Sequence, residues 1–573
     1  MAVVLGINAV FHDPAAALIV DGQTVAAAEE ERFNRVKHGK TAVPFSTWEL
    51  PERSARWCMA RAGISPHEVD AIAYSYDPEL MPADGAGDDD VSAGDWEALR
   101  TLYVRRAPGF LESSFPGMDG TRLRFVRHHV AHAASGYLAA PGRDGAVLVL
   151  DGRGETASHL AGRVRDGQLE VLKTQALPHS LGLMYEDLTV HLGFQRSSDE
   201  YKVMAMASYG KPVQLDRLRR LIRTTGDGGF VVEPIPWDEL APRRESGAGW
   251  NEAHADLAAS VQRRLEEVII ELAGWLYECT GERSLTMAGG VALNCVANSR
   301  LAAEGPFDDI WVQPAAGDAG TALGGALYVA HQMGDPVSPM PSAALGRDWS
   351  DTELEGRLEE ADVAYERPPD LAAAVAEVIA ANGVVAWFQG RSEYGPRALG
   401  HRSLLAHPGY PDNLQRMNAI KGREEFRPVA PMVPVDRAAE IFEGPIPSPF
   451  MLFTHRVRPE WRSRVCAAVH VDGTARAQTV DPRDEPLVYE LLQAVAARTG
   501  VPVLINTSLN TAGRPMVDDP RDVLECFGSA PIDVLAIGPF LVRRPAATRP
   551  VLVRTAATAA RSAPPQYEEI AGA

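Results

Sequence analysis

The sequence predicts an α/β fold in which one structural unit occurs twice. Near the N-terminus three short β runs follow one another, VVLGINA, AAALIVDG and TVAAAEEE, and a similar succession starts at residue 146 with AVLVLDGRGE, HLAGRVRDG and LEVLKTQ. Both copies turn at Asp-Gly-Gln, in 21–23 and in 166–168, and Asp-Gly between apolar runs is a strong hairpin signal. Two such meanders predict a duplicated α/β architecture with a cleft between its halves.

Sugar kinases, actin and the heat-shock ATPases share this duplicated, actin/hexokinase-like (ASKHA) plan. After the second meander, helices are predicted around 184–210 and 252–280, the latter from its 3.6-residue apolar rhythm. The run SLTMAGGVALN indicates a buried strand that enters a Gly-rich turn and a helix. A proline-containing stretch, 333–350, is typical of an interdomain connection. We therefore place a first domain at 1–350 and a second α/β domain at 351–545.

The length of 573 residues exceeds what one hydrophobic core holds, which agrees with at least two domains. Residues 77–95 contain Asp88-Asp89-Asp90 and are interpreted as a polar, acidic insertion. The last segment, 546–573, is rich in Ala, Pro and Arg, and we expect it to be disordered because it has too little apolar surface to bury.

Composition and the N-terminal sequence indicate a cytoplasmic protein. The apolar N-terminus lacks a basic stretch and is interrupted by Asn8, His12 and Asp13, so it is not a signal peptide, and no run of about 18 apolar residues predicts a membrane span. The five cysteines have no CxxC spacing and indicate neither a thiolate zinc site nor a disulfide framework. A net charge of −20 argues against binding to anionic membranes.

The stretch 391–427 is the most informative part of the chain, because it has seven Arg/Lys against four Asp/Glu in an otherwise acidic protein. Its glycines allow close approach of the backbone, and guanidinium groups match phosphate oxygens. It also contains Lys421, one of only six lysines. We interpret the stretch as a pocket for a phosphorylated small molecule; the alternative is a solvated basic face. Nucleic-acid binding is disfavoured because no aromatic-basic pattern accompanies it.

Three histidines in HHVAHAAS suggest a metal site. His128 and His132 would share one face of a helix, with His129 beside them. Asp151 ends a predicted strand and Asp318 lies among small residues. Two imidazoles and two carboxylates suit Fe(II), Mn or Zn, and the sequence does not choose among them. The alternative is a pair of surface or core histidines, and whether the carboxylates join them depends on the fold.

His12 follows the first predicted strand in NAVFHDPAA. Kinases of this fold usually have an aspartate in that turn, whereas this chain has Asn8 and a histidine, which argues against a sugar kinase and for an imidazole acting as general base. A structural turn histidine is the alternative. In AGGVALN, the residues Gly289, Gly290 and Asn294 are candidates for an adenosine site, although a glycine pair after a strand is a weak signal alone.

Several motifs occur together and in order: FHDPAAAL, EEERFNRVKHGK, HHVAHAAS, DGRGE, PHSLGLMYEDLTVHLGF, EYKVMAMASYG, GGVALN, EYGPRALGHRS and LINTSLN. With them the chain resembles the NodU/CmcH family of O-carbamoyltransferases over about residues 1–545. The resemblance implies an actin/hexokinase-like N-terminal domain and a YrdC-like C-terminal α/β domain. It also implies two reactions: the second domain makes carbamoyl-adenylate from carbamoyl phosphate and ATP, with Mg²⁺ accompanying ATP, and the first transfers the carbamoyl group to an acceptor hydroxyl.

Carried onto this sequence, the resemblance assigns His12 as the base that deprotonates the acceptor hydroxyl. It assigns four metal ligands, an iron site in the family: His128, His132, Asp151 and Asp318. It assigns a nucleotide and carbamoyl-phosphate site with Arg397 nearby: Lys421, Arg427, Arg476, Ser508 and Asn510. FRPVAP in place of the usual WRPFAP is a small departure that leaves these residues intact.

The partner implied is a small-molecule acceptor with a hydroxyl group, of the kind modified in antibiotic biosynthesis, and neither nucleic acid nor membrane is expected. The sequence leaves the acceptor, the metal and a possible homodimer open. Threonylcarbamoyl-type tRNA modification is an alternative that the charge of −20 disfavours. A non-catalytic nucleotide-binding regulator is another, but such a protein would be expected to lose His12 or the basic stretch, and both are present.

Overall fold

The computed structural model describes residues 2–39, 49–81, 94–142, 144–511 and 513–544, and shows the predicted duplication. The first sheet has the order β3-β2-β1-β4-β5 and the second the order β8-β7-β6-β11-β12, with two antiparallel and two parallel pairings in each. The first is formed by β1 Val3–Asn8, β2 Ala15–Val20, β3 Gln23–Glu29, β4 Ala71–Tyr74 and β5 Leu123–Phe125. The second is formed by β6 Gly145–Leu150, β7 Ala157–Arg165, β8 Gln168–Ala176, β11 Ser284–Ala288 and β12 Asp309–Val312.

Both predicted Asp-Gly turns are hairpin turns of the same conformation. Asp21 and Gly22 have φ of 52° and 73°, and Asp166 and Gly167 have the same two values. Two successive left-handed residues match the twist of the flanking strands, and Asp-Gly adopts this backbone readily. The structure therefore confirms the α/β class and the repeated meander.

Two helices lie between the sheets: α5 His128–Tyr137 and α12 Ala319–Gln332. They approach closely at Gly324, where an added Cβ would lie 1.9 Å from the carbonyl oxygen of Ala131. The predicted helix over 252–280 is α10 Glu252–Thr280. The stretch around 184–210 forms two helices, α6 Leu181–His191 and α7 Glu200–Ala207, because Gly193, with φ of 70°, interrupts the first.

The C-terminal part, residues 351–544, is a mixed α/β unit, the class that the resemblance to YrdC-like domains implies. Its seven-stranded sheet has the order β19-β15-β20-β14-β13-β21-β22. The strands are β13 Val385–Phe388, β14 Arg402–Ala406, β15 Ala430–Pro434, β19 Gln478–Val480, β20 Leu504–Ser508, β21 Val534–Ile537 and β22 Phe540–Arg543. One face packs on α14 Leu371–Ala380 and α17 Pro486–Thr499, and the other on α13 Asp351–Glu360, α15 Asn413–Ile420 and α18 Pro520–Ser529. Strand β13 shows the alternation, with Trp387 on the first face and Phe388 on the second.

Smaller elements complete the described chain: α1 Glu31–Asn34, α2 Glu52–Ala62, α3 Gly94–Arg105, α4 Ala107–Ser114, α8 Leu215–Leu221, β9 Ile222–Thr224, β10 Phe230–Val232, α9 Trp237–Leu240, α11 Cys295–Glu304, α16 Val435–Ile441, β16 Phe442–Glu443, β17 His455–Val457 and β18 Thr474–Ala475. The stretch 333–350 is the irregular connection between α12 and α13. Most of the predicted insertion 77–95, and the tail 546–573, lie outside the described residues. Among the helices that the structure describes, none combines the length and apolar character needed to cross a membrane.

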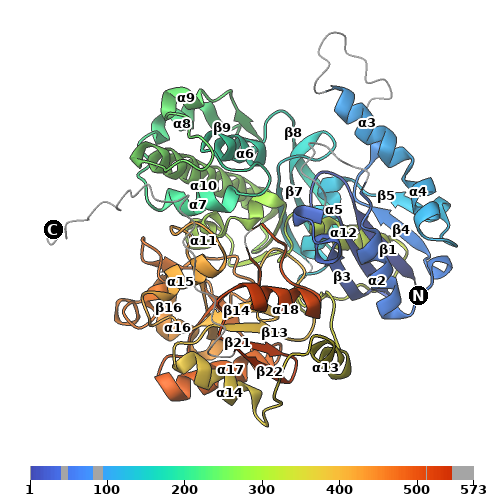
Figure 1. Ribbon diagram of the computed structural model, residues 1–573. Helices are drawn as coiled ribbons and strands as arrows, with labels where there is room; N and C mark the ends of the chain where they lie inside the picture. Colours follow the sequence, from blue (N-terminus) through green and yellow to red (C-terminus); the bar gives the residue numbers. More distant parts are fainter. Residues whose placement is uncertain (1, 40–48, 82–93, 143, 512, 545–573) are drawn as a thin grey trace.

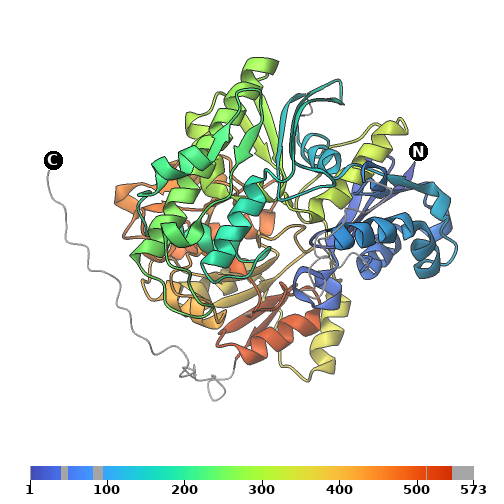
Figure 2. The ribbon, with the colours of Figure 1, turned by 90° about the horizontal axis from the view of Figure 1, so that it is seen from above.

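The C-terminal part contacts both halves of the duplicated unit (Figures 1 and 2). From the first half, Arg32 donates to the carbonyl of Gly395 at 3.0 Å, and Arg35 donates to that of Pro515 at 3.1 Å. From the second half, Asn298 donates to the carbonyl of Leu452 at 3.0 Å. These contacts bring the basic stretch 391–427 against the first 332 residues.

Candidate metal centre and cation pocket

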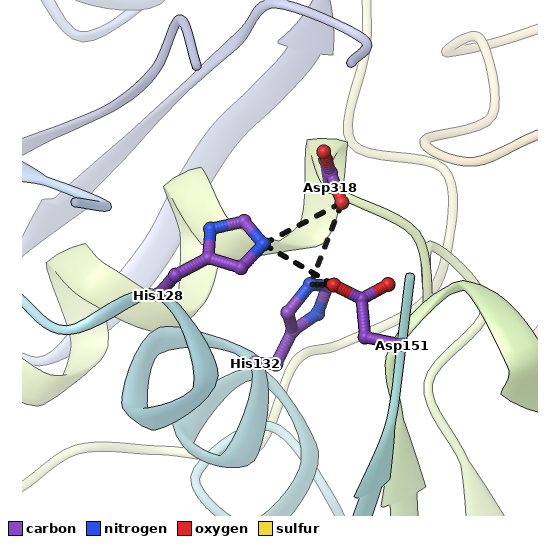
Figure 3. Close-up of side chains that lie close together, drawn as sticks. All are labelled: His128, His132, Asp151 and Asp318. Carbon is purple, nitrogen blue, oxygen red and sulfur yellow. Dashed lines mark ion pairs between the residues drawn. The ribbon is translucent and has the colours of Figure 1, made fainter. Parts of the chain in front are cut away.

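The four predicted metal ligands meet between the two sheets (Figure 3). His128 and His132 come from successive turns of α5, Asp151 directly follows β6, and Asp318 directly precedes α12. The Nε2 atom of His128 lies 3.5 Å from Oδ2 of Asp151 and 3.6 Å from Oδ1 of Asp318, and that of His132 lies 3.7 and 3.5 Å from the same atoms. All four side chains are buried.

The remaining polar atoms of these ligands are largely fixed by backbone groups. The second carboxylate oxygen of Asp151 accepts from the N–H of Gly290 at 3.0 Å, and that of Asp318 accepts from the N–H of His12 at 3.0 Å. His128 donates from Nδ1 to the carbonyl of Ser75 at 3.1 Å, so in the neutral imidazole, the form that binds a metal, Nε2 carries the lone pair. Such outer contacts set the orientation and the tautomer of metal ligands.

Electrostatics favour ionised carboxylates at this site. Burial opposes charge on Asp151 and Asp318, but the neighbouring imidazoles outweigh it and hold the pKa of Asp151 well below its usual value and that of Asp318 below it. Burial likewise opposes charge on His128, yet the two carboxylates raise its pKa well above the ordinary value. Burial lowers the pKa of His132. The cluster therefore has the charge pattern of a site that a cation would complete.

The geometry fits a metal ion. Separations of 3.5–3.7 Å between nitrogen and oxygen are too long for good hydrogen bonds, and within the described chain both Nε2 atoms are buried without a hydrogen-bond partner. An ion about 2.0–2.2 Å from each ligand atom would fill this gap. The buried His/Asp group can thus hold a metal, which a pair of ordinary core histidines would not explain.

His12 lies at the edge of this centre. Its side chain is 30% exposed, and its Nδ1 lies 2.8 Å from Oδ2 of Asp13. The side chain of Asn8 donates to the carbonyls of His12 and Asp13 at 2.8 and 2.9 Å, and these two hydrogen bonds stabilise the turn after β1. Asn8 thus stabilises the turn whose backbone N–H, at His12, donates to the carboxylate of Asp318.

The basic stretch divides into structural and pocket residues. Arg391 donates to the carbonyls of Gly346 and Val25, Arg402 is fully buried and donates to those of Gln389 and Arg347, and Arg416 pairs with Asp533. These contacts give the three guanidinium groups a structural role. The cations that gather in one place are Arg397, Lys421, Arg423 and Arg427, joined by Arg476.

Lys421 is at the centre of this cation pocket. Its Nζ donates to the hydroxyl of Ser508 at 3.0 Å and to the side-chain oxygen of Asn510 at 2.5 Å. Burial lowers the pKa of Lys421 well below the ordinary value, and Arg423 and Arg427 add to the effect. The family resemblance assigned Ser508 and Asn510 to the same nucleotide and carbamoyl-phosphate site as Lys421. The structure brings the three side chains together, and their contact with a phosphate remains a prediction.

The surrounding guanidinium groups repel one another. Burial lowers the pKa of Arg397 to about 9, with Arg476 contributing, and burial lowers that of Arg423 to about 9, with Arg427 contributing. Among the described residues, the Nε atoms of Arg397 and Arg476 are buried without a hydrogen-bond partner. A bound polyanion would relieve this repulsion and satisfy these donors.

We therefore expect pyrophosphate to stabilise the protein against heat. At a hundredfold excess over its dissociation constant, a ligand specific for the folded state adds about 2.7 kcal/mol. Thermal unfolding with pyrophosphate should occur at higher temperature than with sodium chloride of equal ionic strength, and Arg397→Ala should reduce the difference. Equal melting temperatures in the two salts would contradict a built anion pocket.

A single turn of 3₁₀ helix, Gly290–Leu293, separates the two sites. The N–H of Gly290 binds Asp151, and the carbonyl of Leu293 accepts from Arg397 at 3.5 Å. Gly289 has φ of 92°, and an added Cβ would lie 2.2 Å from the carbonyl oxygen of Leu150. Asn294 caps α11 and bonds Gln262. Gly289 and Asn294 thus have structural roles, in the turn and in the cap of α11. That they also contact adenosine stays a prediction.

Helix α7 forms another wall of the cation pocket. Lys202 pairs with Glu424 at 2.8 Å, and the guanidinium of Arg427 lies over the ring of Tyr201 at 4.5 Å. Asp13 and His38 were not predicted as site residues, although the motifs FHDPAAAL and EEERFNRVKHGK contain them; both side chains contact that of His12.

The chain thus combines a duplicated α/β frame with a buried histidine–carboxylate cluster that lies beside a cation pocket. Two family models match the chain: "Carbamoyltransferase N-terminus" over residues 3–118 and 113–327, and "Carbamoyltransferase C-terminus" over 376–544. The chain belongs to this carbamoyltransferase family, with the NodU and NolO proteins among its relatives, and it is a carbamoyltransferase.

Similar proteins cover most of the chain. Nodulation protein NolNO of Sinorhizobium fredii is 38% identical over 94% of this chain and 80% of its own, and Nodulation protein U of Rhizobium tropici is 38% identical over 89% and 91%. An uncharacterized protein of Synechocystis is 36% identical over 95% and 97%. Among solved structures, HypF of T. kodakarensis matches 58% of this chain and 48% of its own with a TM-score of 0.36, and a ROK hexokinase of Thermus thermophilus matches 57% and 99% with 0.27.

Proposed function

We propose that the protein is an ATP-dependent O-carbamoyltransferase that activates the carbamoyl group in the cation pocket and transfers it at the metal centre. The observation that carries this proposal is that the two sites are adjacent. One end of the turn Gly290–Leu293 bonds Asp151 of the metal centre, and the other end bonds Arg397 of the cation pocket. A mixed carbonic–phosphoric anhydride is readily lost to water. Making it in one pocket and consuming it in the next protects it.

In the first reaction, carbamoyl phosphate and ATP give carbamoyl-adenylate. Atom balance requires one water and releases phosphate and pyrophosphate. Arg397, Lys421, Arg427 and Arg476 would hold the phosphate oxygens, while Ser508 and Asn510 hold the ammonium of Lys421 in place. Charge-assisted hydrogen bonds of this kind are stronger than neutral ones. Mg²⁺ would accompany ATP.

In the second reaction, His12 takes the proton of the acceptor hydroxyl as that oxygen attacks the carbamoyl carbon, and AMP leaves. His128, His132, Asp151 and Asp318 would hold Fe(II), with Mn or Zn as alternatives. The ion, when bound, supplies positive charge that stabilises the departing phosphate. Asp318 also holds the backbone of His12 at 3.0 Å, so the general base and a metal ligand keep a fixed relation.

The acceptor is proposed to be a small natural product with a free hydroxyl, and the cytoplasm its place of modification. The test is mass spectrometry of aminoglycoside, macrolide, β-lactam, ansamycin and nodulation-factor acceptors incubated with enzyme, ATP and carbamoyl phosphate. A product in which H is replaced by CONH₂ supports the proposal. A mass gain on tRNA with none on these small acceptors would favour the threonylcarbamoyl-type alternative.

Carbamoylation is expected to require ATP as well as carbamoyl phosphate, with AMP and pyrophosphate appearing in equal amounts to product. The reason is that the cation pocket has several guanidinium groups, more than the one phosphate of carbamoyl phosphate would need. Ion-exchange chromatography of the nucleotides measures this. A full rate from carbamoyl phosphate alone would exclude adenylation.

Lys421→Ala and Arg427→Ala are expected to lower adenylate formation by roughly ten- to hundredfold or more, because a charge-assisted contact contributes about 1.5–3 kcal/mol. Preformed carbamoyl-adenylate should restore product, since neither residue contacts the metal cluster. Pyrophosphate release and product formation are measured in parallel. Arg437→Ala, at a surface pair with Glu440, is the matched control and should keep both activities. Failure of the preformed adenylate to restore product would contradict the division between the sites.

A further inference from the structure

A second group of titratable side chains adjoins the metal centre: His12, Asp13 and His38. The carboxylate of Asp13 lies between two imidazoles, with Oδ2 at 2.8 Å from Nδ1 of His12 and Oδ1 at 3.0 Å from Nδ1 of His38. The other ring nitrogen of His38 lies 2.8 Å from the hydroxyl of Ser198. The carboxylate of Asp13 thus lies between two imidazoles, and Ser198 contacts the far nitrogen of the His38 ring.

The contacts within this group are hydrogen bonds between side chains. Their lengths, 2.8–3.0 Å, contrast with the 3.5–3.7 Å gaps among the four metal ligands. Burial opposes the charge on Asp13, but His12 and His38 outweigh it and hold the pKa of the carboxyl well below its usual value. Asp13 is therefore an anion that only accepts hydrogen bonds.

This assignment fixes the protons of the whole group. An ionised carboxylate has no proton to give, so Nδ1 of His12 and Nδ1 of His38 must both donate to it. In the neutral ring, Nε2 of His38 is then an acceptor, and the hydroxyl of Ser198 donates a hydrogen bond to it. Nε2 of His12 is left as the basic nitrogen of that ring, which is the atom a general base needs.

The backbone is strained where these residues meet. Ten non-glycine residues in the described chain have positive φ, and four lie in this group or directly beside it: Phe11 at 60°, Asp13 at 44°, His38 at 63° and Ser197 at 56°. Such conformations persist only where the surroundings impose them, and they gather at functional sites. A turn histidine with no task beyond packing would not require strain in three segments at once.

We propose that Asp13 is the positioning residue of the general base, and that His38 and Ser198 hold Asp13 in place from behind. Asp13 orients the His12 imidazole and stabilises the imidazolium that forms when Nε2 takes the proton of the acceptor hydroxyl. This inference rests on the proposed role of His12. It goes beyond that role, because it assigns the transfer reaction three further residues.

The decisive variant is Asp13→Asn, which keeps the shape but removes the charge and one of the two acceptor oxygens. With ATP and carbamoyl phosphate saturating, and with the acceptor identified by the mass-spectrometric screen, kcat should fall by at least about tenfold and at most by the full effect of the base, about 10²–10⁴-fold. The KM for the acceptor, the metal content and the single-turnover rate of pyrophosphate release should stay within about threefold. Asp166→Asn, in the same left-handed backbone with φ of 52°, is the control and should be silent.

A double variant separates positioning from a structural role. If Asp13 acts through His12, then Asp13→Asn should cost less than about threefold in transfer when His12 is already asparagine, because residues acting as one unit are not additive. Nitrogen-15 spectra of ring-labelled histidine should show His12 protonated at Nδ1, and this signal should change in Asp13→Asn. An equal loss in both backgrounds, or a His12 ring protonated at Nε2 in the native protein, overturns the inference. If His12→Asn alone leaves transfer intact, the proposed base itself fails, which is a distinguishable outcome.

Discussion

His132→Ala and His128→Ala are each expected to remove the bound metal and to stop carbamoyl transfer while pyrophosphate release continues. Each histidine provides one of four ligand atoms that lie within 4.8 Å of one another. Without it, the carboxylates of Asp151 and Asp318 face each other with a single imidazole between them. Loss of even a supporting contact to a ligand typically costs about 10–100-fold in metal affinity, so loss of a ligand should cost more.

Elemental analysis of the purified variants measures metal, and parallel assays measure pyrophosphate and carbamoylated product. Arg437→Ala, at the exposed pair with Glu440, is the control and should retain metal. Circular dichroism checks that the variants are folded. Full metal occupancy in both alanine variants would place the metal elsewhere.

His12→Asn is expected to slow transfer by about 10²–10⁴-fold, the usual contribution of a positioned general base. Asparagine keeps a polar side chain of similar reach but cannot take the proton. The backbone N–H of residue 12 still donates to Asp318, so metal should be retained, and adenylate should form because the cation pocket is separate.

Single-turnover transfer from preformed carbamoyl-adenylate is the measurement, with metal content determined on the same sample. Loss of metal or of adenylation would make His12 a ligand or a structural residue. Transfer within about threefold of the native rate would assign the base to another group.

The repeated meander could be predicted from local patterns in the sequence. Asp-Gly turns and alternating β runs depend on neighbouring residues only, so both copies could be predicted with their turns. The pair His128 and His132 was equally accessible, because a spacing of four residues places two side chains on one helix face. The interruption between α6 and α7 was not predicted, although Gly193 and the polar run QRSSDE at 195–200 mark it in the sequence.

The basic stretch shows the limit of counting charges. A count of charges treats Arg391, Arg402 and Arg427 alike, yet of these three only Arg427 is in the cation pocket. Arg391 donates to the carbonyl of Val25 in the N-terminal part, and Arg402 donates to those of Gln389 and Arg347. What an arginine does depends on the groups opposite it, and these come from distant segments.

The sequence by itself determined the α/β class, the duplication, the histidine pair and the presence of a basic stretch, because each depends on residues that are close along the chain. Only the tertiary structure brought Asp151 and Asp318 to the histidines, from the end of one strand and the start of a helix far along the chain. It alone joined Asp13 to His38 and Ser198, and set the cation pocket one helical turn from the metal centre. These relations depend on the packing of α5 and α12 between two sheets and of the C-terminal part against both, which no local pattern encodes.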